Sequence, residues 1–143
     1  MKTKKIFFSI TLLGFIYFLT VGFIKSPQTE YTPIEQDKWV APASADKIKN
    51  PLKGDASSIA SGKKIYKMLC FVCHGAKGKG DGMGGTGLKP KPADLTSEIF
   101  QSQSDGAIFW KIEQGRSPMP SYKTSIPEKK RWELINYLRT LRQ

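Results

Sequence analysis

The two cysteines and the single histidine of the chain lie within five consecutive residues, Cys70-Phe71-Val72-Cys73-His74. Two thiols at this spacing can form thioether bonds with the two vinyl groups of a haem, and the adjacent imidazole can then bind the iron. Cys-x-x-Cys-His is the attachment signature of c-type haem. We therefore predict one covalent haem c, held by Cys70 and Cys73, with His74 as one axial ligand of the iron.

Other interpretations explain less of this pattern. A thioredoxin-like redox pair would need a strand–helix–strand context, which the sequence lacks. A disulfide would leave His74 unexplained, and a zinc site would lack a fourth ligand. With two cysteines and one histidine in the whole chain, a multi-disulfide scaffold and a four-cysteine or two-cysteine, two-histidine zinc finger are also excluded.

A methionine is expected on the other face of the haem, because the single histidine is already used. Met68 is too close to the first cysteine on the same predicted helix to cross the ring. Met83 lies in a glycine-rich loop that is long enough for its side chain to reach the other face of the haem. Met119 lies between Pro118 and Pro120, which fix the backbone and lower the entropy of holding a weak thioether on iron. We predict that Met119 is the second axial ligand of the iron. Methionine ligation raises the reduction potential and leaves the iron without an open coordination position.

The elements that position these residues are predicted to be helices. Ser57 or Ser58 can cap a first helix, which carries apolar residues at helical spacing up to the haem motif. Ser102 or Ser104 can cap a second helix, for which Gly115 is a stop signal. The haem motif therefore falls at the end of the first helix.

A third helix is predicted from Pro127, with an apolar stripe at Leu134, Leu138 and Leu141. No convincing alternating strand is present, so the fold class is all-α, with three or four helices and long irregular connections. A domain of this length, residues 55–143, with a Gly/Pro-rich middle would have a thin core by itself. The haem is expected to complete that core.

Residues 1–24 are predicted to be a signal peptide or a single-span membrane anchor. Three lysines within residues 1–5 precede 19 uncharged residues, 6–24. This length suits a membrane span and exceeds an ordinary signal core, although cleavage also fits the layout. The positive flank predicts export of the rest of the chain across the cytoplasmic membrane, either anchored and facing the periplasm or outer side, or soluble in the periplasm after cleavage.

Residues 25–54 are predicted to be a linker. They contain four of the nine prolines and show no sustained periodicity, which is typical of an extended or loosely packed spacer. Trp39 is unusual in such a segment. It either anchors a partner or folds back onto the surface of the domain, and we favour the second interpretation.

The charge balance indicates an acidic partner. The 143 residues include 23 Lys and Arg against 12 Asp and Glu, a formal charge of +11. Five lysines follow the haem motif or the Met119 loop, and they could ring an exposed haem edge or form a scattered solvated surface: Lys77, Lys79, Lys89, Lys91 and Lys123. No aromatic–basic interleaving supports nucleic-acid binding.

The motifs together resemble class I (mitochondrial-type) cytochrome c, as found in exported bacterial single-haem proteins. The resemblance runs from near Ala60 to the C-terminus and depends on four segments in order: Gly62–Tyr66, Cys70–His74, Pro118–Pro120 and Leu134–Leu138. It implies that two helices cross at Gly62, so that Gly62 and Tyr66 pack on Leu134 and Tyr137.

The resemblance also implies a role for the segment after the haem motif. Residues 75–87 hold seven of the thirteen glycines, which suits a tight loop over the haem edge better than a phosphate site. In the family, a proline carbonyl in this region accepts the imidazole N–H of the haem histidine. Pro90 and Pro92 are the two candidates.

The expected function is electron transfer between membrane-associated or periplasmic redox partners, with no catalytic residues and no small-molecule substrate. A membrane tether would hold the domain near its partners. Two alternatives stay open: a haem subunit of a larger oxidoreductase complex, and a haem sensor or enzyme with an open sixth site.

Overall fold

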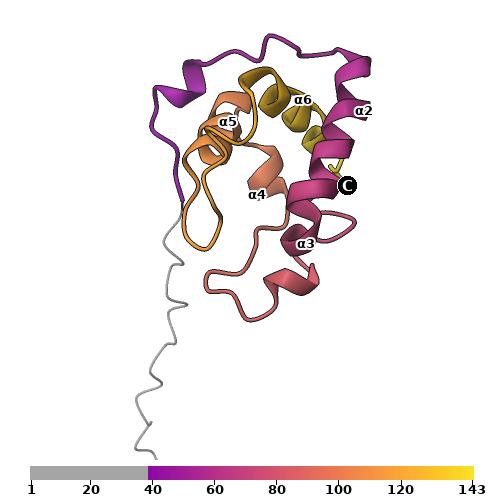
Figure 1. Ribbon diagram of the computed structural model, residues 1–143. Coiled ribbons are helices and arrows are strands. Elements are labelled where there is room, and N and C mark those ends of the chain that lie inside the picture. Colours follow the sequence, from indigo (N-terminus) through magenta and orange to yellow (C-terminus); the bar gives the residue numbers. More distant parts are fainter. Residues whose placement is uncertain (1–38) are drawn as a thin grey trace, which may run out of the picture. The chain divides into compact units, whose positions relative to one another are not determined.

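A computed structural model describes residues 39–143 of the chain (Figure 1). The predicted N-terminal segment 1–24 and the first part of the predicted linker lie outside the described residues. The elements in order are η1 (Ala45–Lys47), α2 (Ala56–Ile65), the π-helical turn η2 (Tyr66–Cys70), α3 (Phe71–His74), η3 (Met83–Gly85), α4 (Glu98–Gln101), α5 (Asp105–Gln114) and α6 (Glu128–Arg139).

The described part of the chain is helical and contains no β-sheet, so the predicted all-α class is confirmed. Long irregular connections join the helices, as expected from the glycines and prolines (Figure 1). Between residues 39 and 143, no helix combines the length and the apolar character needed to cross a membrane.

Helices α2 and α6 cross at Gly62. A Cβ atom added there would clash with the backbone of Glu133 and would lie 2.9 Å from the Cβ of Tyr137. One turn further along α2, the ring of Tyr66 lies against that of Tyr137, with 5.3 Å between centroids. These contacts confirm the helix crossing expected from the resemblance. Glycine is needed at this position because a side chain would prevent the two backbones from approaching so closely.

The helix ends follow simple capping rules, with one correction. The side chain of Asp55, not Ser57 or Ser58, caps α2 and accepts a hydrogen bond from the Ser57 backbone N–H. Aspartate competes well for this position because its carboxylate also meets the positive end of the helix. Ser104 caps α5, which ends at Gly115 as predicted.

The core lies between α2, α5 and α6. Its central feature is the stack of Phe109 on Trp132, with 4.0 Å between ring centroids. The side chains of Tyr66, Ile108, Leu134 and Ile135 are less than 2% exposed. Cys70 and Met119 are partly buried and pack against the edge of this cluster. The core is therefore continuous with the segments that carry the predicted site.

Residues 39–54, here called the strap, belong to the predicted linker and lie against the helices. Ala45 is 1% exposed, and a Cβ atom on Gly106 of α5 would be 2.7 Å from the Ile48 carbonyl oxygen. Trp39 folds back onto the domain, with its ring centroid 6.4 Å from that of Trp110, as the favoured interpretation predicts. Whether the domain begins at residue 55 stays a prediction.

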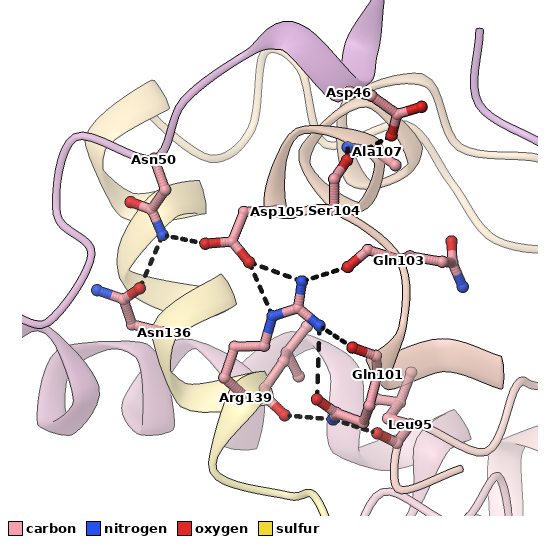
Figure 2. A network of polar contacts seen from close by, with 11 residues as sticks. Asp46, Asn50, Leu95, Gln101, Gln103, Ser104, Asp105, Ala107, Asn136 and Arg139 are labelled. Carbon is pink, nitrogen blue, oxygen red and sulfur yellow. Dashed lines mark hydrogen bonds and ion pairs between the residues drawn. The ribbon is translucent and has the colours of Figure 1, made fainter. Parts of the chain in front are cut away.

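A polar network fixes the C-terminal half of the strap (Figure 2). Asn50 donates to the Asp105 carboxylate at 2.9 Å and to the Asn136 amide oxygen at 2.8 Å. Arg139 donates to the other oxygen of Asp105 and to the backbone carbonyls of Gln101 and Gln103. The strap, α5 and α6 are thus joined through one partly buried network of hydrogen bonds.

Candidate haem-binding site

The predicted attachment residues lie on one short stretch of helix. The chain runs from α2 through the turn η2 into α3 without interruption (Figure 1), so that Cys70 ends η2 while Cys73 and His74 lie in α3. Both cysteines are free thiols and partly buried. A single helical turn therefore presents two thiols and an imidazole, the donor set that covalent haem attachment needs.

The electrostatics of Cys70 argue against a thiol–disulfide function. Burial, and then the neighbouring Cys73, raise the pKa of the Cys70 thiol to about 12. Redox-active cysteines instead have a lowered pKa that favours the thiolate nucleophile. The thioredoxin-like interpretation therefore finds no support in the geometry.

A backbone carbonyl orients the imidazole of His74. Its Nδ1 atom lies 3.0 Å from the carbonyl oxygen of Ala93, which leaves Nε2 for a metal. Burial lowers the pKa of His74, while the Ala93 carbonyl acts in the opposite direction, so the ring is kept neutral and fit for ligation. The expectation of a Pro90 or Pro92 acceptor is wrong.

The Pro92 carbonyl oxygen lies against Gly80 of the glycine loop, where an added Cβ atom would clash with it. The Ala93 carbonyl oxygen is the one that lies within hydrogen-bond distance of the His74 Nδ1 atom. The acceptor is therefore in the predicted region, one residue after Pro92.

The glycine loop, residues 75–87, is tied directly to the backbone of the haem motif. Gly80 donates its N–H to the His74 carbonyl at 2.9 Å, and Gly82 donates to that of Cys73 at 3.1 Å. The buried hydroxyl of Tyr66 donates to the Gly75 carbonyl at 2.6 Å. A Cβ atom at Gly85 would lie 2.8 Å from the Cys73 carbonyl oxygen. The close approach explains why glycines dominate this loop.

The three methionines of the described residues differ sharply in exposure. The side chains of Met68 and Met83 are 71% and 90% exposed, whereas Met119 is partly buried against the core. Exposed side chains without packing are poorly placed to hold a weak thioether–iron bond. Of the three candidates, Met119 is the one that the fold immobilises.

Met119 lies in a hairpin, residues 115–122, that closes on itself and returns to α5. Arg116 and Met119 exchange two backbone hydrogen bonds, of 3.0 and 2.8 Å. Tyr122 donates its N–H to the Ile112 carbonyl at 3.1 Å. At Gly115, with φ of +66°, a Cβ atom would lie 2.5 Å from the Ser121 nitrogen, so the two ends of the hairpin touch there. Figure 1 shows this orange loop extending from α5.

Tyr122 connects this hairpin to the haem motif. Its hydroxyl lies 3.4 Å from the Leu69 carbonyl oxygen, one residue before the first cysteine. Burial raises the pKa of Tyr122, and the Cys70 and Cys73 thiols act in the same direction because they are close. The structure thus brings the Met119 hairpin beside the cysteines. Within residues 39–143, no hydrogen bond joins Met119 to His74.

Arg131 holds the chain that follows the hairpin. Its guanidinium is buried and donates to the carbonyls of Lys123 and Ile126 at 2.8 and 2.6 Å, above the ring of Phe109. It also lies 3.6 Å from the Glu113 carboxylate at the end of α5. One side chain of α6 therefore fixes the return path of the loop that carries Met119.

The surface around the motif fits a haem. Four apolar side chains of η2, α3 and η3, close in sequence to the motif, are each 47% exposed or more: Met68, Phe71, Val72 and Met83. Haem would cover apolar surface of this kind, and the two thiols and free imidazole nitrogen supply the bonds to it. The residues present therefore match the prosthetic group that the sequence predicts.

Ala93, Tyr122 and Arg131 are site residues that sequence reasoning missed. The Ala93 carbonyl carries no side-chain signal. Tyr122 offers one, because an aromatic residue three positions after a candidate ligand in a proline-rich loop is expected to pack. Arg131 offers another, since it directly precedes Trp132 in a helix whose apolar stripe continues at Leu134 and Leu138.

An all-α fold with a Cys-x-x-Cys-His turn and a proline-flanked methionine loop defines a c-type cytochrome of class I-like type. A family model described as cytochrome c oxidase, cbb3-type, subunit III matches residues 57–138, which include all four predicted site residues. The match covers more than half of the chain, and the chain belongs to this family. Membership implies a covalently bound haem with its iron and a role in electron transport.

Solved structures that are similar to this chain include two redox proteins. A reducing HAO-like protein complex of Kuenenia stuttgartiensis matches 67% of this chain with 31% identity and a TM-score of 0.59. The match covers 50% of that protein, so this chain spans half of its length. The c-type cytochrome KustC0563 matches 57% of this chain with 25% identity and a TM-score of 0.50, over 98% of its own length. No curated protein matches the chain.

Proposed function

We propose that this chain carries one haem, attached through thioethers to Cys70 and Cys73, with His74 and Met119 as the axial ligands of its iron. The observation that supports the proposal is that the fold holds the side chains of both proposed axial ligands. His74 is oriented by the Ala93 carbonyl. Met119 is the one described methionine that packs against the core.

The proposed activity is electron transfer without a catalytic residue. When bound, the haem supplies an iron that alternates between ferrous and ferric states. The chain's own residues exclude water, fix both ligands and so keep the reorganisation on electron transfer small. The closed ligand set leaves no position for a substrate, which favours an electron carrier over an enzyme or sensor.

The proposed partners are redox proteins with acidic faces. Four lysines on the segments that pack around the haem motif are exposed: Lys77, Lys79, Lys89 and Lys91. Such a group of cations attracts an acidic surface and speeds association at low ionic strength. We also propose export across the cytoplasmic membrane, because the positively flanked apolar segment 6–24 is of a kind that directs export.

A second candidate is a haem subunit held in a larger oxidoreductase. Two observations favour it: the family is described as a subunit, and one similar structure is a redox protein complex. The haem chemistry would be unchanged. Affinity isolation of the tagged chain from solubilised membranes distinguishes the two, because a subunit co-purifies in fixed stoichiometry and a free carrier does not.

The test is an absorption spectrum of the reduced full chain, produced with a c-type haem maturation system, before and after addition of carbon monoxide. A c-type spectrum that carbon monoxide leaves unchanged is expected for the closed ligand set. Met119→Ala should bind carbon monoxide, whereas Met83→Ala, the matched control, should not. If the wild type binds carbon monoxide as readily as Met119→Ala, the ligation proposed here is wrong.

A further inference from the structure

Trp39 lies at the N-terminal end of the strap and contacts the base of the Met119 hairpin. Its ring centroid is 5.2 Å from the Arg116 guanidinium carbon and 5.7 Å from the Lys111 ammonium. The ring of Trp110 lies on another side, at 6.4 Å. Trp39 therefore sits among residues from the end of α5 and from the first turn of the hairpin.

Arg116 is the residue that closes the turn around Met119. Its N–H donates to the Met119 carbonyl at 3.0 Å, and its own carbonyl accepts from the Met119 N–H at 2.8 Å. The side chain held against Trp39 thus belongs to the direct backbone partner of the proposed iron ligand. Cation–π attraction between guanidinium and indole is among the stronger contacts of this type.

The strap that delivers Trp39 is itself anchored. Ala45 is buried, and Ser104 donates to the Asp46 carboxylate at 2.5 Å. Asn50 is fixed by Asp105 and Asn136 (Figure 2). None of these contacts involves a proposed haem ligand. The strap that carries Trp39 is therefore attached to the domain by contacts that do not depend on haem.

We propose that Trp39 is a positioning residue for Met119: through Arg116 it holds the hairpin closed and so strengthens the sixth ligand. This inference rests on the ligation under Proposed function. An external ligand such as imidazole binds the ferric iron only when Met119 leaves, so its apparent affinity rises with the open fraction of the hairpin.

The experiment uses the haem-loaded full chain and the variants Trp39→Ala, Trp39→Phe and, as a matched neighbour, Val40→Ala. Val40 is 73% exposed and should behave as the wild type. Trp39→Ala should raise the apparent imidazole affinity about two- to fivefold, the equivalent of ~0.5–1 kcal/mol for one exposed cation–π contact. Trp39→Phe, which keeps a weaker aromatic face, should fall between.

A second measurement follows the hairpin without reference to the iron. Trypsin cleaves after Arg116 only when the hairpin opens, and mass spectrometry identifies that site. Cleavage there should be faster in Trp39→Ala than in Val40→Ala, with a smaller change in Trp39→Phe. If Trp39→Ala matches Val40→Ala in both imidazole affinity and cleavage rate, Trp39 does not position the hairpin.

Failure of the ligation itself gives a different pattern. If Met119→Ala has the ferric spectrum and imidazole affinity of the wild type, Met119 is not a ligand and the proposed function loses its sixth ligand. In that case the cleavage rate alone decides whether Trp39 holds the hairpin. If Met119→Ala differs from the wild type and Trp39→Ala does not, the ligation stands and the positioning role is refuted.

Discussion

Replacing Gly62 with alanine tests the helix crossing on which the haem motif is built. Inside a helix, alanine is more favourable than glycine by about 1 kcal/mol, so propensity alone predicts a more stable protein. The structure predicts the opposite sign. The new Cβ atom would clash with the Glu133 backbone and lie 2.9 Å from the Tyr137 Cβ, and backbone cannot move aside as a flexible side chain can.

The size of the effect follows from these two terms. Forcing a methyl group into a packed contact costs about 1–3 kcal/mol, and the separation of α2 from α6 would add lost contacts at Tyr66 and Tyr137. After the gain in propensity, we expect a net loss of about 1–2 kcal/mol in the free energy of unfolding. For a domain of this size, that lowers Tm by roughly 5–15 °C.

Thermal unfolding of the haem-loaded protein, followed by far-ultraviolet circular dichroism, measures this shift. Ala60→Gly is the matched control, because Ala60 is an exposed residue of the same helix and the substitution exchanges the same two residue types. It should lose about 1 kcal/mol from propensity alone. A Tm for Gly62→Ala at or above the wild type would refute the close helix contact.

Two further predictions concern the loop that carries Met119 and the acid stability of the fold. Arg131→Met keeps an apolar stem but removes two hydrogen bonds from a charged donor to loop carbonyls, so urea unfolding should show a loss of about 3 kcal/mol; a loss under about 0.5 kcal/mol would contradict this role. Hydrogen bonds from Ser57 and Thr96 hold the pKa values of Asp55 and Asp94 below the usual value. The contribution of these two carboxylates to the stability of the fold is therefore full above about pH 4, and it is lost as the pH falls through the lowered pKa values. Asp55→Asn and Asp94→Asn keep an accepting oxygen but do not titrate, so the decline of Tm in acid should be shallower; an unchanged decline would exclude both groups.

The parts of the fold that the sequence predicts well are those set by local chemistry. Gly115 ends α5 and Ser104 begins it, because each acts through its own backbone or side chain. The haem motif is equally local, since its three donors lie within one turn. The Gly62 crossing needed the family resemblance, because a lone glycine in a helix does not say what approaches it.

The parts that the sequence predicts poorly depend on direction and on distant partners. The choice of Ala93 over the two prolines depends on which backbone carbonyl the folded loop brings to His74, and no side chain signals this. The packing of the strap depends on Gly106, whose missing side chain admits the strap backbone, and on the bonds of Asn50 to two helices. Composition marks such a segment as a spacer because its contacts lie about 55 and 86 residues away.

The two sides of the site are held by different kinds of contact, and this sets how each can fail. On the His74 side, the loop is held mainly by backbone hydrogen bonds and close glycine contacts, to which the Tyr66 hydroxyl adds one side-chain hydrogen bond. On the Met119 side, three side chains from separate elements supplement the backbone hydrogen bonds of the hairpin: Trp39, Tyr122 and Arg131. Truncating any of these three should therefore loosen the proposed Met119 ligation before it disturbs attachment through the cysteines and His74. Such variants should retain full covalent haem while their affinity for external ligands rises.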